Sequence, residues 1–235
     1  MANLITIGRI ALLFLTVTLI YRGNVTIITV CMALVAVTFA LDGFDGWVAR
    51  RRNETSQFGA VFDIAGDRIV ETVLWVAFAD LGLIPIWVPF LVITRGTVVD
   101  ALRSLSYAQG MTAFGERNMM RSALTRWLTA GRFMRALFGY AKAAGFVFLT
   151  GLEAYQHHDA AGSLIGDVYG LAVVRWIGWG IVWLAVGLTV VRGVPVIVDA
   201  VALWGRPLPQ SQRPDVAAGA DVRPERRSPS TPSAP

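Results

Sequence analysis

The chain has 235 residues, of which 55% are hydrophobic and only 16% are charged, and its formal net charge is +5. Since a water-soluble domain has about a quarter of its residues charged, this composition excludes an ordinary soluble enzyme and predicts an all-α integral membrane protein. Basic residues in so apolar a chain suit an anionic membrane surface, so we expect a lipid bilayer as partner and no nucleic acid.

About six hydrophobic segments are long enough to cross a bilayer as helices. They lie near residues 4–21, 24–49, 58–83, 85–107, 134–152 and 168–192. Acidic residues interrupt the second and third segments at their facing ends, and charged residues also interrupt the fourth. Because charges inside a membrane segment gather where the protein encloses a polar site, we expect about six transmembrane helices around a polar cavity.

The loops between the segments alternate in basic content. Three arginines stand at residues 50–52 and several more at 108–136, whereas 83–86 and 153–167 contain none. By the positive-inside rule, both termini and the acidic ends of the second and third segments face the cytoplasm. We therefore expect a multi-pass protein of the inner or plasma membrane with a cavity that faces the cytoplasm.

Two stretches differ from the apolar segments. Residues 108–133 carry apolar and basic positions at near-helical spacing, which predicts an amphipathic helix on the membrane surface. From Arg206 onward the chain is rich in Pro, Ser, Arg and Ala, and such a composition cannot build a packed core. The sequence thus predicts a transmembrane domain at 1–205 and a disordered cytoplasmic tail at 206–235.

Four acidic residues, three small residues and one arginine stand at fixed spacing around the second loop. In chain order they are Asp42, Asp45, Gly46, Ala49, Arg50, Gly59, Asp63 and Asp67. Residues three or four apart share a helix face, so Asp42 and Asp45 line one helix, and Asp63 and Asp67 line the next. An antiparallel pair of helices joined at the polar residues 51–58 would bring these acids face to face.

Carboxylates at such range cannot all stay ionised without cations between them. Oxygen ligands suit hard divalent ions, so four acids predict two divalent cations, Mg²⁺ or Mn²⁺. Gly46, Ala49 and Gly59 leave room beside the acids, and the planar fork of Arg50 suits phosphate. Together these features indicate a diphosphate site. A buried structural polar cluster is the alternative, but it would not need small residues and an arginine in register.

The complete pattern D-x-x-D-G-x-x-A-R-x(8)-G-x-x-x-D-x-x-x-D at residues 42–67 resembles the signature of the CDP-alcohol phosphatidyltransferases. The resemblance implies a phospholipid-synthesis transferase that moves a phosphatidyl group from CDP-diacylglycerol to a small hydroxylated acceptor and releases CMP. Family members are commonly homodimers, so we expect a homodimer. A membrane transporter for cations or protons is the alternative from a different class, because buried acids are typical there too.

The family motif also implies a role for each residue. The metal ligands would be the four acids, Asp42, Asp45, Asp63 and Asp67. The contacts to CDP and its phosphates would be Gly46, Ala49, Arg50 and Gly59. Asp67 would in addition be the catalytic base that accepts the proton of the acceptor hydroxyl.

The acceptor has weaker signals. Arg95 and the Ala-Leu-Arg that ends at Arg103 resemble a helix of bacterial phosphatidylglycerophosphate synthases, although Gly96 stands where those enzymes have Glu. The Gly-x-x-Lys that ends at Lys142 resembles their Gly-Lys-x-Lys. This favours glycerol 3-phosphate, bound by Arg103 and Lys142, with inositol phosphate or another alcohol as alternatives. Arg103 would otherwise pair with Asp100 as an i, i+3 neighbour, and Lys142 would anchor at the interface.

Two further polar positions have two interpretations each. The opening Asn3-x-x-Thr6-x-x-Arg9 resembles the Asn-x-x-Thr-x-x-Arg common in the family, but it is equally typical of a helix cap followed by an interfacial arginine. Glu71 lies one helical turn beyond Asp67, where it either extends the acidic stripe or hydrogen-bonds to another helix.

Overall fold

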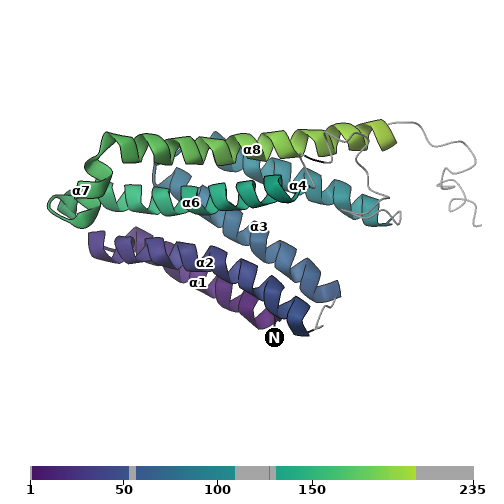
Figure 1. Cartoon of the computed structure of the whole chain (residues 1–235), viewed down its shortest axis with the longest axis horizontal. Helices are drawn as coiled ribbons and strands as arrows, with labels where there is room; N and C mark the ends of the chain where they lie inside the picture. The colour runs from purple at the N-terminus through teal and green to yellow at the C-terminus, as the bar shows by residue number, and fades with distance from the viewer. Residues whose placement is uncertain (1, 53–56, 109–126, 128–130, 205–235) are drawn as a thin grey trace, which may run out of the picture.

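A computed structural model of the chain describes residues 2–52, 57–108, 127 and 131–204, and the described part is helical (Figure 1). The long helices are α1 (Ala2–Arg22), α2 (Val25–Arg52), α3 (Gln57–Asp80), α4 (Trp87–Ala108), α6 (Arg132–Gln156) and α8 (Ala172–Trp204). The 3₁₀ turn η1 (His158–Ala160) and the short helix α7 (Leu164–Gly170) connect α6 to α8.

Local chemistry explains where the helices begin and end. The Asn24 side chain accepts a hydrogen bond from the Ile27 backbone N–H at 3.0 Å, which caps α2 directly after α1 ends. Gly82, in the turn after α3, has a φ of +75°, a conformation that favours glycine. Ser163 caps α7, since its hydroxyl oxygen accepts from the Gly166 backbone N–H at 3.1 Å.

The helices pack in two groups, which meet where α2 packs against α6 and where α3 packs against α4. Helices α1 and α2 lie side by side, α6 and α8 lie side by side, and α3 runs obliquely through the bundle (Figure 1). Helix α1 packs against both α2 and α3, α2 packs against α6, and α4 packs against α3 and α8. This arrangement brings the first half of α3 close to the start of α1 and the end of α2.

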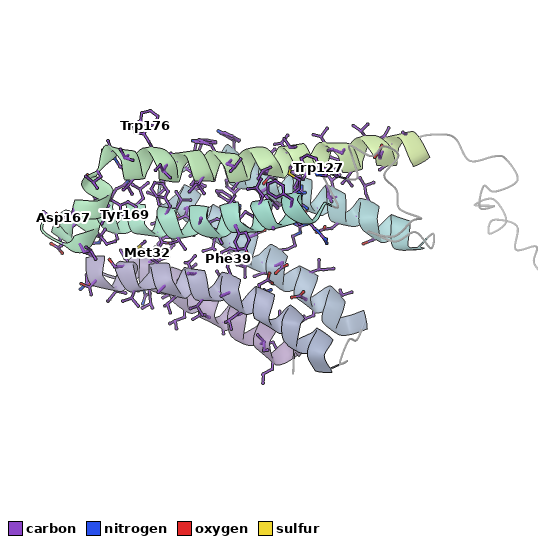
Figure 2. All side chains as sticks on the ribbon, in the orientation of Figure 1. Met32, Phe39, Trp127, Asp167, Tyr169 and Trp176 are labelled. Atoms are coloured by element: carbon purple, nitrogen blue, oxygen red, sulfur yellow. The ribbon has the colours of Figure 1, made fainter. Side chains whose placement is uncertain are left out.

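An aromatic core holds α2, α3 and α6 together. The Phe146 ring of α6 stacks on Phe39 of α2 at 5.6 Å between centroids and meets Trp75 of α3 edge-on at 4.7 Å. Phe39 lies between α2 and α6, while Trp176 points outward from α8 (Figure 2). Such aromatic pairs add to the apolar area that they bury, so the core fixes α3, which carries two of the predicted acids, against α6, which carries Lys142.

The expected all-α integral membrane fold is confirmed for the described residues. Three helices contain a stretch long and apolar enough to cross a membrane, Leu4–Arg22, Val25–Gly43 and Ala172–Ala202. The helices α3, α4 and α6 have 24, 22 and 25 residues but carry more polar positions. The number of crossings and the side that the polar cavity faces stay predictions.

The last segment differs from its expected bounds. We expected a span at 168–192, but α8 begins at Ala172 and continues through Pro195 to Trp204. A proline costs a helix one backbone hydrogen bond, and the packing of this apolar helix against α4 and α6 outweighs that loss. The predicted surface helix at 108–133 and tail at 206–235 lie almost entirely outside the described residues.

Candidate metal and diphosphate site

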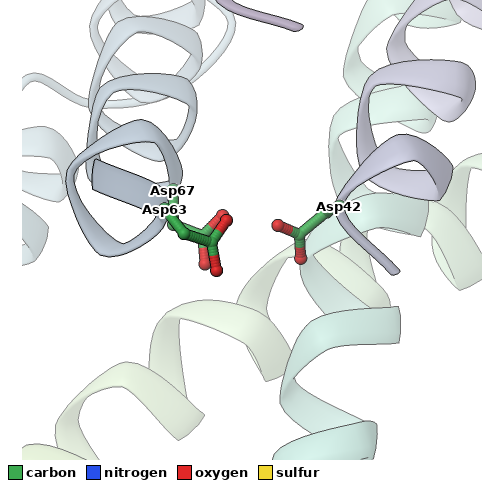
Figure 3. A group of neighbouring side chains, drawn as sticks. All are labelled: Asp42, Asp63 and Asp67. Atoms are coloured by element: carbon green, nitrogen blue, oxygen red, sulfur yellow. The ribbon is translucent and has the colours of Figure 1, made fainter. Parts of the chain in front are cut away.

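Three of the four predicted acids meet at one end of the bundle. Asp42 lies near the end of α2, and Asp63 and Asp67 lie one turn apart in the first half of α3. Asp63 and Asp67 project from the same helix toward Asp42 (Figure 3). One carboxylate oxygen from each acid lies within 4.8 Å of the others. The spacing in the sequence therefore corresponds to a real convergence of side chains from two helices.

A buried arginine from α1 lies against these acids. The Arg9 side chain is 1% exposed, and it donates to Oδ1 of Asp42 and, at 2.8 Å, to Oδ1 of Asp67. Its Nη2 also lies 3.7 Å from Oδ1 of Asp63. The acid side chains are 40%, 44% and 51% exposed for Asp42, Asp63 and Asp67. The cluster thus has a cation on its buried side and is open on the other.

A glycine makes this position of Arg9 possible. A Cβ atom added to Gly66 of α3 would lie 2.6 Å from Cγ2 of Thr6 and 3.0 Å from Nη2 of Arg9. Thr6 and Arg9 lie one turn apart on α1, and both are buried. Thr6 and Arg9 therefore pack on α3 beside the acids, which favours the family resemblance of the opening segment.

The acids fit a hard divalent cation. Oδ1 of Asp63 is buried and accepts no hydrogen bond from the described residues, because Nη2 of Arg9 lies 3.7 Å from it, too far for one. A buried carboxylate oxygen that accepts no hydrogen bond is destabilised, and a metal ion bound at this site would satisfy it. Oxygen atoms from three carboxylates within 4.8 Å are the kind of ligand set that Mg²⁺ and Mn²⁺ prefer.

The other predicted donor-site residues are placed only by their backbone. Asp45, Gly46, Ala49 and Arg50 lie on the last turns of α2, and Gly59 lies in the first turn of α3. The side chains of Asp45, Ala49 and Arg50 lie outside the described part of the structure. Their roles as metal ligand and phosphate contacts stay predictions.

A second charged group joins α3 to α4. Arg68 donates from Nε to Oδ2 of Asp100 at 2.6 Å and from Nη2 to Oδ1 at 2.9 Å. This two-bond pairing fixes the guanidinium plane. Asp100 is therefore held by Arg68. Its pairing with Arg103, the alternative considered from the sequence, stays untested because the Arg103 side chain lies outside the described residues. Gly96 lies beside this pair, and a Cβ added to it would make ordinary contact with Nη1 of Arg68 at 3.6 Å.

Glu71 extends this charged group to α6. Its Oε2 lies 3.0 Å from Nζ of Lys142 and 3.4 Å from Nη1 of Arg68. Asp63, Asp67 and Glu71 follow one another at intervals of four residues along α3, so Lys142 is joined to the helix that carries the acids. Both interpretations of Glu71 from the sequence hold together: it continues the acidic stripe and bonds to another helix.

Three cations surround the Phe138 ring of α6. Nζ of Lys142 lies 4.4 Å from the ring centroid, Cζ of Arg192 lies 5.0 Å away and Cζ of Arg95 lies 6.0 Å away. They come from α6, α8 and α4. Gly193 allows Arg95 to pass close to α8, because a Cβ added to Gly193 would lie 2.7 Å from Cγ of Arg95. Lys142 is paired with Glu71, and together with Arg95 and Arg192 it makes this positive region around Phe138 a candidate site for an anion.

Sequence reasoning missed Arg192 and Arg68 as members of these groups. Arg192 stands in the second half of the apolar helix α8, in the run Val190-Val191-Arg192-Gly193. A cation inside an apolar membrane segment is a signal that could have singled it out. Arg68 directly follows Asp67, and nothing in its spacing distinguishes it from a residue of the donor motif.

Comparison with known proteins places this chain in one family. The family model described as CDP-alcohol phosphatidyltransferase matches residues 1–191. A Mycobacterium tuberculosis protein named as a cardiolipin synthase is 28% identical over 82 residues, which cover 35% of this chain and 39% of that protein. A CDP-diacylglycerol–glycerol-3-phosphate 3-phosphatidyltransferase of Pectobacterium atrosepticum is 28% identical over 139 residues, 58% of this chain and 73% of that protein.

A third relative comes from a plant. CDP-diacylglycerol–inositol 3-phosphatidyltransferase 1 of Arabidopsis thaliana is 46% identical over 44 residues, 19% of each chain. The chain thus spans well under half the length of two of these three relatives, and their names differ in the acceptor alcohol.

Proposed function

Because the chain belongs to the CDP-alcohol phosphatidyltransferase family, we propose that it transfers a phosphatidyl group from CDP-diacylglycerol to a small alcohol and releases CMP. The observation that carries the proposal is the convergence of Asp42, Asp63 and Asp67, whose carboxylate oxygens lie within 4.8 Å of one another beside a buried arginine. Membership in this family argues against the cation or proton transporter considered from the sequence.

In the proposed reaction the acceptor hydroxyl attacks the lipid-side phosphorus of the diphosphate. A new P–O bond forms to the acceptor, the P–O bond to CMP breaks, and the hydroxyl proton passes to a carboxylate. We assign this proton transfer to Asp67, because half of its side chain is exposed on the open side of the cluster while Arg9 holds one of its oxygens from the buried side. Arg9 also keeps Asp67 in a fixed orientation relative to Asp42.

We propose two divalent cations, Mg²⁺ or Mn²⁺, as the cofactors. The residues that would hold them are Asp42, Asp45, Asp63 and Asp67. When bound, such ions neutralise the charge of a diphosphate and of the departing phosphate. Gly46, Ala49, Arg50 and Gly59 are the proposed contacts of the CDP moiety, as the family motif implies.

Glycerol 3-phosphate is the proposed acceptor. A phosphate monoester carries about two negative charges near neutral pH, and the region around Phe138 places Lys142, Arg95 and Arg192 within 6.0 Å of one ring. The name of the Pectobacterium relative agrees with this acceptor. Arg103 remains a proposed contact on α4. The alternatives are inositol phosphate and other alcohols, and the three cations favour the phosphorylated ones.

We further propose that the site faces the cytoplasm and that the protein acts as a homodimer in the cell membrane. The orientation is supported by the arginines at residues 50–52, which follow directly on the helix end that carries Asp42. The dimer is carried over from the family resemblance.

A CMP-release assay tests the function. The purified protein would receive CDP-diacylglycerol, Mg²⁺ or Mn²⁺, and in turn glycerol 3-phosphate, inositol 1-phosphate, inositol and phosphatidylglycerol. We expect CMP release that depends on glycerol 3-phosphate and is lost in Asp67→Asn but kept in the matched control Asp167→Asn, an exposed acid of α7. Absence of acceptor-dependent CMP with every alcohol would refute the proposal.

A further inference from the structure

The contact between Glu71 and Lys142 joins the two groups that the proposed reaction must bring together. Glu71 lies one turn beyond Asp67 on α3, and Lys142 lies on α6 beside the Phe138 ring. The distance from Oε2 of Glu71 to Nζ of Lys142 is 3.0 Å. This ion pair is thus a direct connection between the acidic stripe and the positive region around Phe138.

The burial of Glu71 makes the contact strong. Glu71 is only 4% exposed, and its Oε2 lies within ion-pair range of two cations, Lys142 and Arg68. A buried carboxylate needs such partners, because an ion without them is strongly destabilised away from water. Arg68 is itself fixed by two hydrogen bonds to Asp100 on α4, so Glu71 has little freedom to move.

Lys142, by contrast, has a flexible side chain. A lysine stem has four rotatable bonds and tends to extend its ammonium group toward water. In this protein the ammonium group instead lies between the Glu71 carboxylate and the Phe138 ring face, 4.4 Å from the ring centroid, where Arg192 and Arg95 also lie. The Glu71 carboxylate is the group that holds it there.

We propose that Glu71 is a positioning residue that holds the Lys142 ammonium group at the phosphate end of the acceptor, at a fixed place relative to Asp67. The inference rests on the proposed function, because it assigns the phosphate of the acceptor to the region around Phe138. Glu71 does not touch the acceptor. It acts through Lys142 and sets the affinity for a phosphorylated alcohol, while the CDP-diacylglycerol site keeps its own ligands.

Steady-state kinetics separates this role from a general loss of structure. In Glu71→Gln we expect the KM for glycerol 3-phosphate to rise roughly tenfold or more, the size expected when a hydrogen bond between charged groups is lost. The KM for CDP-diacylglycerol should stay within about twofold of the wild-type value, because the CDP-diacylglycerol site keeps its own ligands. Glu71→Asp keeps the charge on a shorter stem, so its KM for glycerol 3-phosphate should lie between the values of the wild type and Glu71→Gln.

A double variant tests whether Glu71 acts through Lys142. If it does, Glu71→Gln combined with Lys142→Met raises the KM for glycerol 3-phosphate no more than Lys142→Met alone. Independent effects that multiply in the double variant would overturn the proposal, and so would a Glu71→Gln change that raises both KM values equally.

Chemical labelling supplies a readout without turnover. Lys142 is the sole lysine of the sequence, so modification by an amine reagent, located by peptide mass, reports on this side chain and is separated from the N-terminal amine. We expect slow labelling of Lys142 in the wild type and in the control Glu153→Gln, which changes an acid on the same helix as Lys142. Labelling should be several times faster in Glu71→Gln.

Kinetics and labelling together distinguish a failure of the positioning role from a failure of the proposed acceptor. Equal labelling rates in wild type and Glu71→Gln would overturn the positioning role, whatever the activity. Faster labelling in an enzyme that releases CMP without any phosphorylated acceptor would refute the proposed acceptor, and with it the assignment of Lys142 to the acceptor phosphate.

Discussion

Arg9 on α1 and Asp67 on α3 are joined by a hydrogen bond of 2.8 Å from Nη2 to Oδ1, and the same guanidinium also bonds to Asp42 on α2. One buried cation thus connects the three helices that form the acidic site. Because Arg9 occupies the buried side, the acids remain accessible on the opposite side. We infer that Arg9 keeps the carboxylates together when no other cation is bound.

Replacement of Arg9 should therefore lower the free energy of unfolding of the metal-free protein. Arg9→Gln leaves acids facing one another without their buried counter-charge, and we expect a loss of about 2–3 kcal/mol, below the range for a fully buried pair because the acids are half exposed. Thermal unfolding in detergent with a chelator measures this loss. Added Mn²⁺ should raise the Tm of Arg9→Gln more than that of the wild type, because the ion replaces the missing positive charge.

A matched control for this variant is Arg175→Gln. Arg175 lies on α8 and donates to the backbone carbonyls of Tyr169 and Gly170, away from the acids. Added Mn²⁺ should raise the Tm of Arg175→Gln no more than that of the wild type. An Arg9→Gln protein as stable as the wild type in chelator would show that Arg9 does not hold the site together.

Gly66 offers a test of the packing that places Arg9. Gly66→Ala introduces a Cβ that would lie 2.6 Å from Thr6 and 3.0 Å from Arg9, and such overpacking costs about 1–3 kcal/mol. We expect a lower Tm together with reduced CMP release. Gly187→Ala on α8 is the control, because a Cβ there meets no other atom within 4 Å. An equal Tm and equal CMP release in the two variants would contradict the close crossing of α1 and α3.

Asp67→Asn tests the proposed base. We expect a fall in kcat of about 10²–10⁴-fold, the usual contribution of general acid–base catalysis. Binding of CDP should be retained at least in part, because the contacts proposed for the nucleotide lie on other residues. Stopped-flow or radiometric CMP release and equilibrium binding of labelled CDP measure the two effects. Full turnover in Asp67→Asn would assign the proton transfer to another group.

Arg192 is one of the two cations that sequence reasoning missed, and its role can be measured. Arg192→Gln should raise the KM for glycerol 3-phosphate several-fold, as expected for the loss of one charged contact to a phosphate. The KM for inositol, which has no phosphate, should not change if inositol is accepted at all. A rise in the KM for CDP-diacylglycerol instead would place Arg192 at the donor site.

Much of this architecture could be predicted because hydrophobic length and acid spacing are local properties. The apolar segments correspond to α1, α2, α3, α4, α6 and α8, and the four-residue step from Asp63 to Asp67 predicts a shared helix face. The convergence with Asp42 followed from the polar turn between the two helices.

The remaining features depend on how helices cross, which a single sequence does not reveal. Arg9 reaches the acids only because Gly66 lets α1 approach α3 closely. Asp100 on α4 pairs with Arg68 on α3, a contact between two helices that no spacing within one helix predicts. Arg192 approaches Phe138 because α8 packs along α6.

Binding of Mn²⁺, followed by electron paramagnetic resonance of the purified protein, tests the central claim most directly. The account predicts saturable binding in the wild type and in Asp167→Asn, and loss of most of that binding in Asp42→Asn and in Asp63→Asn, because those acids supply converging ligands from two helices. Equal Mn²⁺ binding in all four proteins would contradict it.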